Sequence, residues 1–246
     1  MAGHSKWANI KHKKARQDAA RGKIFTKIAR ELMVAARQGG PDPEANFRLR
    51  LALQKARDAN MPNDNIKRAI SRGSGDSEGE NYEQITYEGY GPGGIAILMD
   101  ILTDNRNRTV GEIRHILSRN GGNLGESGCV AWMFNRKGLI LVSRENSSLA
   151  EDELMLAALE AGAEDVRAAG EGWEVVSSPE EFETVKAELE GAGIAPAMAE
   201  ITMLPDTLTK VEGELNSQLM QLIETLEEHD DVQNIYTNWD MPEDME

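Results

Sequence analysis

The sequence predicts an α+β protein of three domains: a small helical bundle followed by two ferredoxin-like α/β sandwich domains, one inserted in the other. A chain of 246 residues has the length of about two domains and permits three. Up to residue 75 the apolar residues recur at the three- and four-residue steps of helices, and after it they form strand-like runs. Residues 138–205 read strand, helix, strand, strand, helix, strand, which is the split β-α-β pattern.

The leading segment is predicted to contain three helices. They are expected over residues 17–38, 45–60 and 63–72. The run Gly39-Gly40-Pro41 ends the first helical pattern, and Pro62 and Gly73 bracket the third. Helices this short are marginal alone, so we expect them to pack as a bundle. The following run GSGDSEGEN, at residues 73–81, has the composition of a linker.

The rest of the chain is predicted to form the two α/β domains. Strands are expected over residues 83–88, 94–102, 130–134 and 139–142, near 166, and over 173–176, 201–204 and 232–236; helices are expected over 109–119, 148–162, 178–189 and 213–228. Asn135-Arg136-Lys137-Gly138 is interpreted as a turn, and Ser178 as the N-cap of its helix. The predicted domains are residues 1–75, residues 82–134 plus 206–240, and residues 135–205, the last inserted in the second.

The composition excludes several classes of protein. One cysteine, Cys129, rules out an internal disulfide, and we expect it to be inert packing at the start of a buried strand. Four scattered histidines beside that thiol are too few for a structural zinc site, and no metal or other cofactor is expected. The longest apolar run, at residues 93–102, is too short for a membrane span, and the basic amino terminus lacks the apolar stretch of a secretory signal. We therefore expect a cytoplasmic protein.

The net charge of −15 hides a sharp division along the chain. Residues 1–75 carry 17 lysines and arginines against six acidic residues, a net charge of +11. The other 171 residues carry 10 basic and 36 acidic side chains, a net charge of −26. A strongly basic segment attached to an acidic body indicates a polyanion partner, although a charged run can also serve solubility alone.

The basic segment supplies the candidate nucleic-acid-binding residues. They are His4, Lys6, Trp7, Lys11, His12, Lys13, Lys14, Arg16, Arg21, Lys23, Lys27 and Arg30. Lysine and arginine neutralise phosphates and release counterions, which gives affinity that falls with salt. Trp7 is expected either to stack on an unpaired base or to pack on the bundle.

Residues 104–109 form a second, weaker candidate for binding an anion. Arg106, Asn107 and Arg108 lie where a buried strand ends and a helix begins, and free backbone N–H groups there attract negative charge. The structural alternative, which we favour, has Asn107 as the helix cap and the two arginines paired with local carboxylates.

No sequence motif indicates catalysis. The run from Gly89 to Gly94 formally matches the dinucleotide fingerprint G-x-G-x-x-G, but a strand follows it where that fingerprint needs a helix. A glycine-rich turn between two strands is the better interpretation. The chain has no Walker-type GK[ST] run, no glycine-flanked nucleophilic serine and no HExxH. We expect no catalytic residue and no small-molecule substrate.

Four runs resemble the YebC family. They are MAGHSKWANIKHKKARQDAARGKIFTK at residues 1–27, YEGYGPGG at 87–94, DNRNRT at 104–109 and GGNLG at 121–125. The resemblance extends over essentially the whole chain. It implies a helical amino-terminal domain, two α/β domains with one inserted in the other, and a cytoplasmic regulator of gene expression without catalytic residues or cofactors. Bacterial members of that family are described as probable DNA-binding transcriptional regulators, and other members act on translation at the ribosome.

The residues and the resemblance together predict a non-enzymatic, nucleic-acid-binding regulator of gene expression. DNA is the expected partner, and ribosomal or transfer RNA at the ribosome is the alternative. The acidic α/β domains are expected to offer a surface to a protein partner. Two rivals stay open: an enzyme that uses the glycine-rich turn and the arginine pair, and an adapter that binds proteins alone.

Overall fold

The structure is a computed structural model that describes residues 22–75, 82–144, 151–170 and 172–242. These residues form two compact units: residues 22–127 with 217–235, and residues 128–216 with 236–242. Among the described residues, no helix combines the length and apolarity that crossing a membrane requires.

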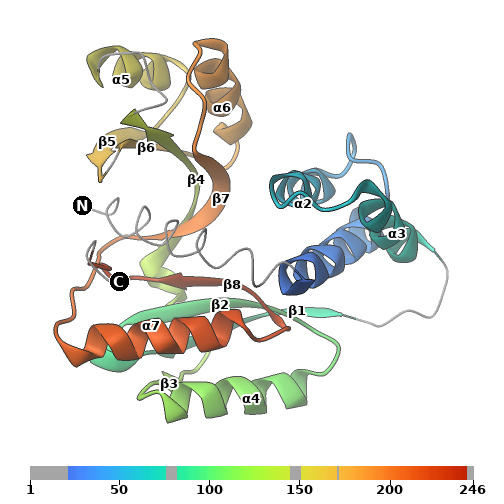
Figure 1. Cartoon of the computed structure of the whole chain (residues 1–246), viewed down its shortest axis with the longest axis vertical. Coiled ribbons are helices and arrows are strands. Elements are labelled where there is room, and N and C mark those ends of the chain that lie inside the picture. Colours follow the sequence, from blue (N-terminus) through green and yellow to red (C-terminus); the bar gives the residue numbers. More distant parts are fainter. Residues whose placement is uncertain (1–21, 76–81, 145–150, 171, 243–246) are drawn as a thin grey trace. The chain divides into compact units, whose positions relative to one another are not determined.

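Three helices open the first unit and confirm the predicted helical segment where it is described (Figure 1). They are the helix over residues 22–39, α2 (Phe47–Asp58) and α3 (Asn63–Ser74). Their apolar faces enclose a core around Leu32, Leu49 and Ala52, none of which is exposed. Asn46 caps α2, because its side-chain oxygen accepts from the N–H of Leu49 at 3.0 Å. The Asn46 amide also donates to the Ala35 carbonyl at 2.8 Å and so joins two helices.

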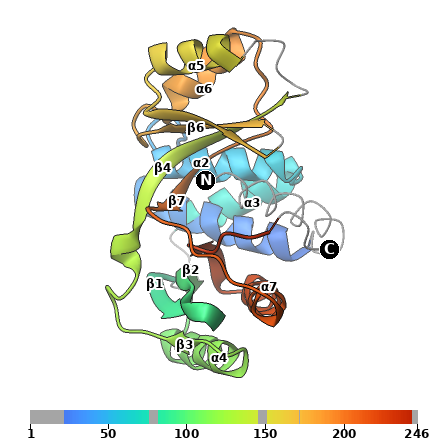
Figure 2. The same cartoon turned by 90° about the vertical axis from the view of Figure 1, so that its left-hand side faces the viewer.

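The same unit contains a four-stranded sheet in the order β3-β1-β2-β8. Its strands are β1 (Glu83–Tyr90), β2 (Ala96–Thr103), β3 (Asn123–Leu124) and β8 (Val232–Thr237). The helices α4 (Arg106–Arg119) and α7 (Glu214–Glu227) cover one face of it (Figures 1 and 2). Leu117 from α4 and Leu222 from α7 meet Ile97 and Met99 of β2 in a common core. The β1–β2 connection is a glycine-rich turn with positive φ at Gly93 and Gly94, as predicted.

The strand expected at residues 130–134 is wrong. Residues Ala131–Met133 form a 3₁₀ turn, and the third strand of the sheet is the two-residue β3, which pairs with the end of β1. Along residues 130–134 only the end residues Val130 and Phe134 are buried, while Trp132 is 72% exposed. In a strand, buried and exposed side chains alternate from one residue to the next. Here the exposure rises from Val130 to Trp132 and falls again to Phe134, which fits a turn and not a strand. Cys129 precedes this turn, half-buried, and does not start a strand.

The second unit contains the inserted sheet, in the order β5-β6-β4-β7. Its elements in chain order are β4 (Phe134–Ser143), α5 (Glu151–Glu160), β5 (Asp165–Ala169), β6 (Gly172–Ser177), α6 (Phe182–Gly191) and β7 (Met198–Pro205). β4 pairs antiparallel with both β6 and β7, and α5 and α6 cover one face (Figures 1 and 2). This arrangement confirms the split β-α-β pattern. The predicted domain boundaries themselves remain a prediction.

The turn expected at Asn135–Gly138 is wrong, because these four residues lie inside β4 and pair with residues 201–204 of β7. Turn-forming composition misled the prediction. A Cβ atom on Gly138 would collide with Ser177 Oγ and would lie 2.7 Å from the Phe182 ring, so glycine is there for close packing of α6 on the sheet.

The helix expected from residue 178 begins later, at Phe182 in α6. Ser178 is not its N-cap, although the Ser178 hydroxyl accepts from the N–H of Glu181 at 3.2 Å. That bond closes a turn before the helix instead of the first helical turn. Ser148, expected to open the helix that contains α5, lies outside the described residues.

Substitution Gly138→Ala is expected to destabilise the chain by about 1–3 kcal/mol, because the added methyl group overpacks the contact with Phe182. Urea unfolding of the purified chain measures this change. Gly191→Ala is the matched control, since its Cβ meets nothing within 4 Å. Equal stability of the two variants would show that Gly138 is not a packing glycine.

Candidate nucleic-acid interface

Nine of the predicted nucleic-acid-binding residues lie outside the described residues. These are His4, Lys6, Trp7, Lys11, His12, Lys13, Lys14, Arg16 and Arg21. The other three, Lys23, Lys27 and Arg30, lie on the helix over residues 22–39 and share one face of it, because they are three or four residues apart.

This face of the helix contacts the end of α7, within the same unit. Lys27 Nζ donates to the Glu227 carbonyl at 2.6 Å, and Lys23 Nζ donates to the Glu228 carbonyl at 3.3 Å. Arg30 continues the row with a bond of 2.8 Å to the Asp230 carbonyl. The last carbonyls of a helix lack intrahelical partners and carry partial negative charge. Lys27 and Lys23 therefore bind the carbonyls at the carboxyl end of α7, and Arg30 binds the turn that follows this helix.

Asp231 anchors the same contact. Its buried carboxylate accepts from Arg30 at 3.1 Å, from Arg108 at 2.7 Å and from the Thr109 hydroxyl at 2.7 Å. Burial opposes the charge of Asp231, but the hydrogen bonds from Arg108 and Thr109 outweigh it and hold the pKa of this carboxyl below its usual range. The bonds to Asp231 and then to Asp104 raise the pKa of Arg108. Asp231 thus joins helix 22–39, α4 and β8.

In the structure, the residues of the second candidate site have different surroundings. Asn105, not Asn107, is the N-cap of α4: its backbone is extended and its side chain accepts from the N–H of Arg108 at 3.1 Å. Arg108 pairs with three carboxylates, those of Asp104, Glu112 and Asp231. Arg106 is exposed and forms no ion pair within the described part of the chain, and Asn107 is exposed beside it.

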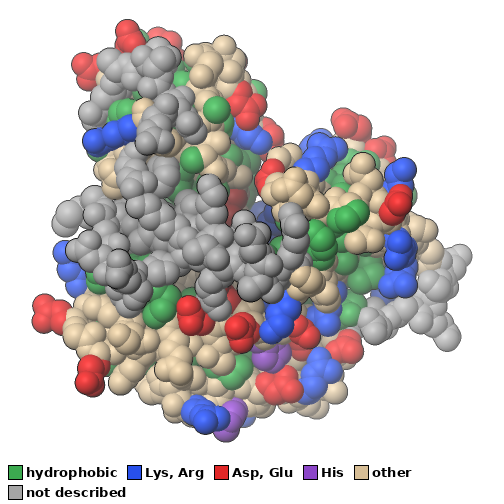
Figure 3. Space-filling model, viewed as in Figure 1, with side chains coloured by type: hydrophobic (Ala, Val, Ile, Leu, Met, Phe, Trp, Pro, Cys, Tyr) green, Lys and Arg blue, Asp and Glu red, His purple; other side chains and the backbone are tan. Residues whose placement is uncertain are grey.

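A further basic surface was missed by sequence reasoning. Lys67, Arg68 and Arg72 lie on the exposed side of α3, opposite its buried Ile66 and Ala69. None of the three forms an ion pair with any described residue. We call these residues the α3 basic face. Figure 3 shows lysine and arginine side chains over the three-helix segment, at the right of the view. The spacing of these cations against the apolar stripe would have predicted this face.

The connection that leads into α3 is short. Residues 59–62 separate α2 from α3, and Asn60 adopts a left-handed backbone with φ of 54°. Connections of three or four residues occur in helix-turn-helix motifs and also in other helical hairpins. At the start of α2, Phe47 is 41% exposed and the Arg50 guanidinium lies 5.6 Å from its ring centre.

The fold and this surface define a class of protein, in which a basic three-helix segment precedes two helix-covered sheets along the chain. Among the described residues, this protein has no membrane-spanning helix. Comparison with known families identifies it further. Residues 5–76 match the N-terminal domain of the TACO1/YebC protein, and residues 82–239 match the TACO1/YebC second and third domain. The chain belongs to the TACO1/YebC family.

Relatives match along their whole length. A protein of Pelotomaculum thermopropionicum is 58% identical over 98% of this chain and 99% of its own. One of Natranaerobius thermophilus is 56% identical over 100% of this chain and 98% of its own. Both are named probable transcriptional regulatory protein. The crystal structure of a conserved hypothetical protein from Aquifex aeolicus matches with a TM-score of 0.81 and 46% identity over 94% of this chain and 95% of that one.

Proposed function

We propose that this chain is a cytoplasmic, non-enzymatic regulator of gene expression that binds nucleic acid through its helical segment. The α3 basic face carries the proposal, because its three cations project into solvent without carboxylate partners among the described residues. Phosphate oxygens are the partners that such a row of lysine and arginine attracts. The basic residues before residue 22 add charge of the same sign.

DNA is the proposed partner. The relatives' name, probable transcriptional regulatory protein, supports a role in transcription. The short α2–α3 connection also supports it, since the second helix of a helix-turn-helix motif enters the major groove. In this proposal the α3 basic face contacts the phosphates, and Lys23, Lys27 and Arg30 hold their helix against α7. The acidic remainder of the chain limits indiscriminate binding.

RNA at the ribosome is the second candidate, and one observation favours it. Phe47 and Arg50 expose an aromatic ring with a guanidinium above it, next to the basic helices. Unpaired bases, which RNA loops offer and duplex DNA does not, stack on such groups.

Competition binding separates the two candidates. The full chain is titrated with a promoter-length DNA duplex and with a stem-loop RNA of equal charge, at physiological salt and with nonspecific competitor. Tighter retention of the duplex supports transcription, and tighter retention of the stem-loop together with its loss in Phe47→Ala supports the ribosomal alternative. Retention of neither nucleic acid contradicts both.

Replacement of Lys11, Lys13 and Lys14 with alanine is expected to flatten the salt dependence of binding. The logarithmic slope should fall by about two to three, at roughly 0.7 to 0.9 for each phosphate that a lysine no longer neutralises. The measurement is the affinity of the full chain for nucleic acid at several salt concentrations. An unchanged slope would remove these lysines from the interface.

A further inference from the structure

One edge of the first sheet is largely open. β1 pairs with β2 along its whole length, but with β3 only at Gly89 and Tyr90. Next to that short pairing, the Glu88 carbonyl accepts from the N–H of Gly125 at 2.8 Å, so the main-chain groups of Glu88 point outward from β2. In a strand these directions alternate, so the N–H and C=O of Gln84 and Thr86 point the same way. Neither residue has a main-chain partner on that side within the described residues.

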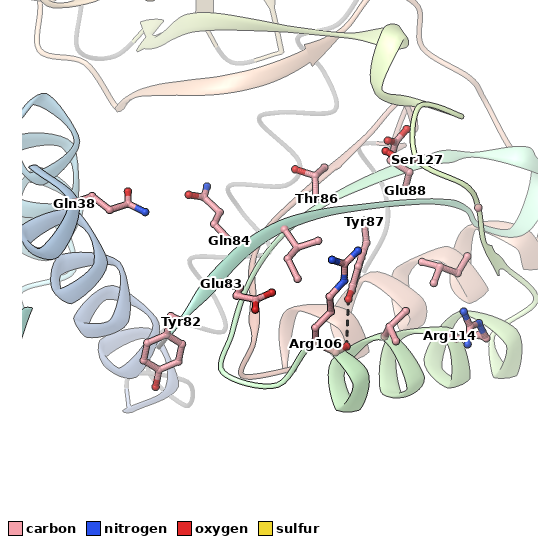
Figure 4. Close-up of a pocket in the computed structure, with 14 residues that line it drawn as sticks. Gln38, Tyr82, Glu83, Gln84, Thr86, Tyr87, Glu88, Arg106, Arg114 and Ser127 are labelled. Carbon is pink, nitrogen blue, oxygen red and sulfur yellow. Dashed lines mark hydrogen bonds between the residues drawn. The ribbon is translucent and has the colours of Figure 1, made fainter. Parts of the chain in front are cut away.

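A hollow of about 850 Å³ lies beside this edge, and α4 forms its far wall (Figure 4). Arg106, Val110 and Arg114 line it from α4. They are four residues apart and therefore share one face of the helix. Neither arginine forms an ion pair with a described carboxylate. Burial raises the pKa of Tyr87, whose protonated hydroxyl lies 3.5 Å from the Arg106 carbonyl at the floor of the hollow.

We propose that this edge of β1 binds an extended, acidic segment of a protein partner, which adds a strand to the sheet. The incoming strand hydrogen-bonds to the main chain of Gln84 and Thr86, and its side chains on one face meet α4. Arg106 and Arg114 are about 12 Å apart along a helix axis, at 1.5 Å per residue. Residues i and i+4 of a strand are about 13 Å apart on one face. The partner segment therefore reads acidic, any, apolar, any, acidic, with the apolar residue on Val110.

The open edge fits a polypeptide better than a nucleic acid. It offers alternating donors and acceptors, which another main chain complements. Phosphate oxygens only accept hydrogen bonds, so they would leave the Gln84 and Thr86 carbonyls unsatisfied. A second copy of β1 also fits poorly, because Glu83 and Glu88 point to opposite faces and no two acidic residues of β1 lie four apart.

The test uses the full chain and a fluorescein-labelled peptide, TETVTET, followed by fluorescence anisotropy. The control peptide TKTVTKT has the same length with lysine for glutamate. We expect TETVTET to bind with a dissociation constant below about 1 mM and at least about tenfold more tightly than the control. A preference for the acidic peptide is informative, because the chain itself carries a net charge of −15.

Two changes address the strand edge directly. Thr86→Pro removes an outward N–H without breaking a bond to β2, and it should lower the affinity at least about tenfold, while Thr86→Ala leaves it unchanged. TETVTET methylated at its edge-facing amides should also fail to bind, and this probe needs no altered protein. Arg106→Glu combined with Arg114→Glu should reverse the preference between the two peptides. Nucleic-acid affinity of the Thr86→Pro variant should stay unchanged.

Several results overturn the proposal. These are absence of saturable binding up to about 1 mM, equal binding of the methylated peptide, and equal binding by Thr86→Pro. A chain that is dimeric and becomes monomeric on Thr86→Pro would assign the edge to a second copy. Oligouridylate that displaces TETVTET and loses affinity on Arg106→Glu but not on Thr86→Pro would assign the hollow to nucleic acid.

Discussion

Replacing Lys67, Arg68 and Arg72 together with glutamine is expected to weaken nucleic-acid binding by the full chain at least about tenfold at physiological salt, and to lower its salt slope by about two to three. The three side chains form the α3 basic face and pair with no described carboxylate, so their replacement removes the cations that we propose to contact phosphates and leaves the helical core intact. Titration of a labelled duplex at several salt concentrations measures both quantities.

The control removes the same charge from the acidic part of the chain. Arg119, Arg136 and Lys210 are exposed basic residues outside the helical segment, and their joint replacement with glutamine should leave affinity nearly unchanged. Thermal unfolding of both variants verifies that they fold. Equal weakening by the two variants would mean that overall charge, and not the α3 basic face, sets the affinity.

Asp231→Asn is expected to destabilise the chain by about 2 kcal/mol, because it leaves Arg30 and Arg108 without their shared carboxylate. The expected cost lies below that of a wholly buried pair, since the Arg108 side chain is 43% exposed. Denaturant unfolding measures it. Asp104→Asn is the matched control: its side chain is 40% exposed, so the cost should stay within about 0.5 kcal/mol.

The same carboxylate predicts a pH dependence of stability. The pKa of Asp231 is lower in the folded chain than its ordinary value of 3.8, so the stabilisation is fully present above that value. It is lost as the pH falls through the folded pKa, where protonation breaks the pairs. The difference in the free energy of unfolding between the unaltered chain and Asp231→Asn should therefore shrink as the pH falls below about 4. A gap that stays constant to about pH 2 would contradict the assignment.

Hydrophobic periodicity predicted most of the fold. The stripes of α3 and α7 and the apolar run of β2 are long enough to decide between helix and strand. Errors arose where local composition and tertiary packing disagree. Gly138 follows turn-forming residues, yet it lies in a strand, where Phe182 comes so close that only a residue without a side chain fits. The two residues of β3 are too few to show a hydrophobic pattern. They form a strand because they pair with β1.

The candidate site was predictable in charge but not in geometry. The charge distribution along the sequence identified the helical segment as the basic part of the chain. The structure shows which of its basic residues have partners within the chain and which are exposed. Lys27 and Arg30 meet carbonyls and a carboxylate about 200 residues away in sequence, which no local pattern reveals. The open edge of β1 depends equally on the shortness of β3. The expected cap at Asn107 was wrong because Asn105 already adopts the extended conformation that a cap requires.

Ultraviolet crosslinking in growing cells, followed by sequencing of the attached nucleic acid and mass spectrometry of the attached peptide, tests most directly whether the helical segment is the nucleic-acid-binding part. We expect crosslinked peptides from residues 1–75, with α3 among them, attached to a defined set of DNA or RNA sequences. Crosslinks confined to the sheets, or no recovered nucleic acid from cells that contain the intact chain, would contradict the assignment.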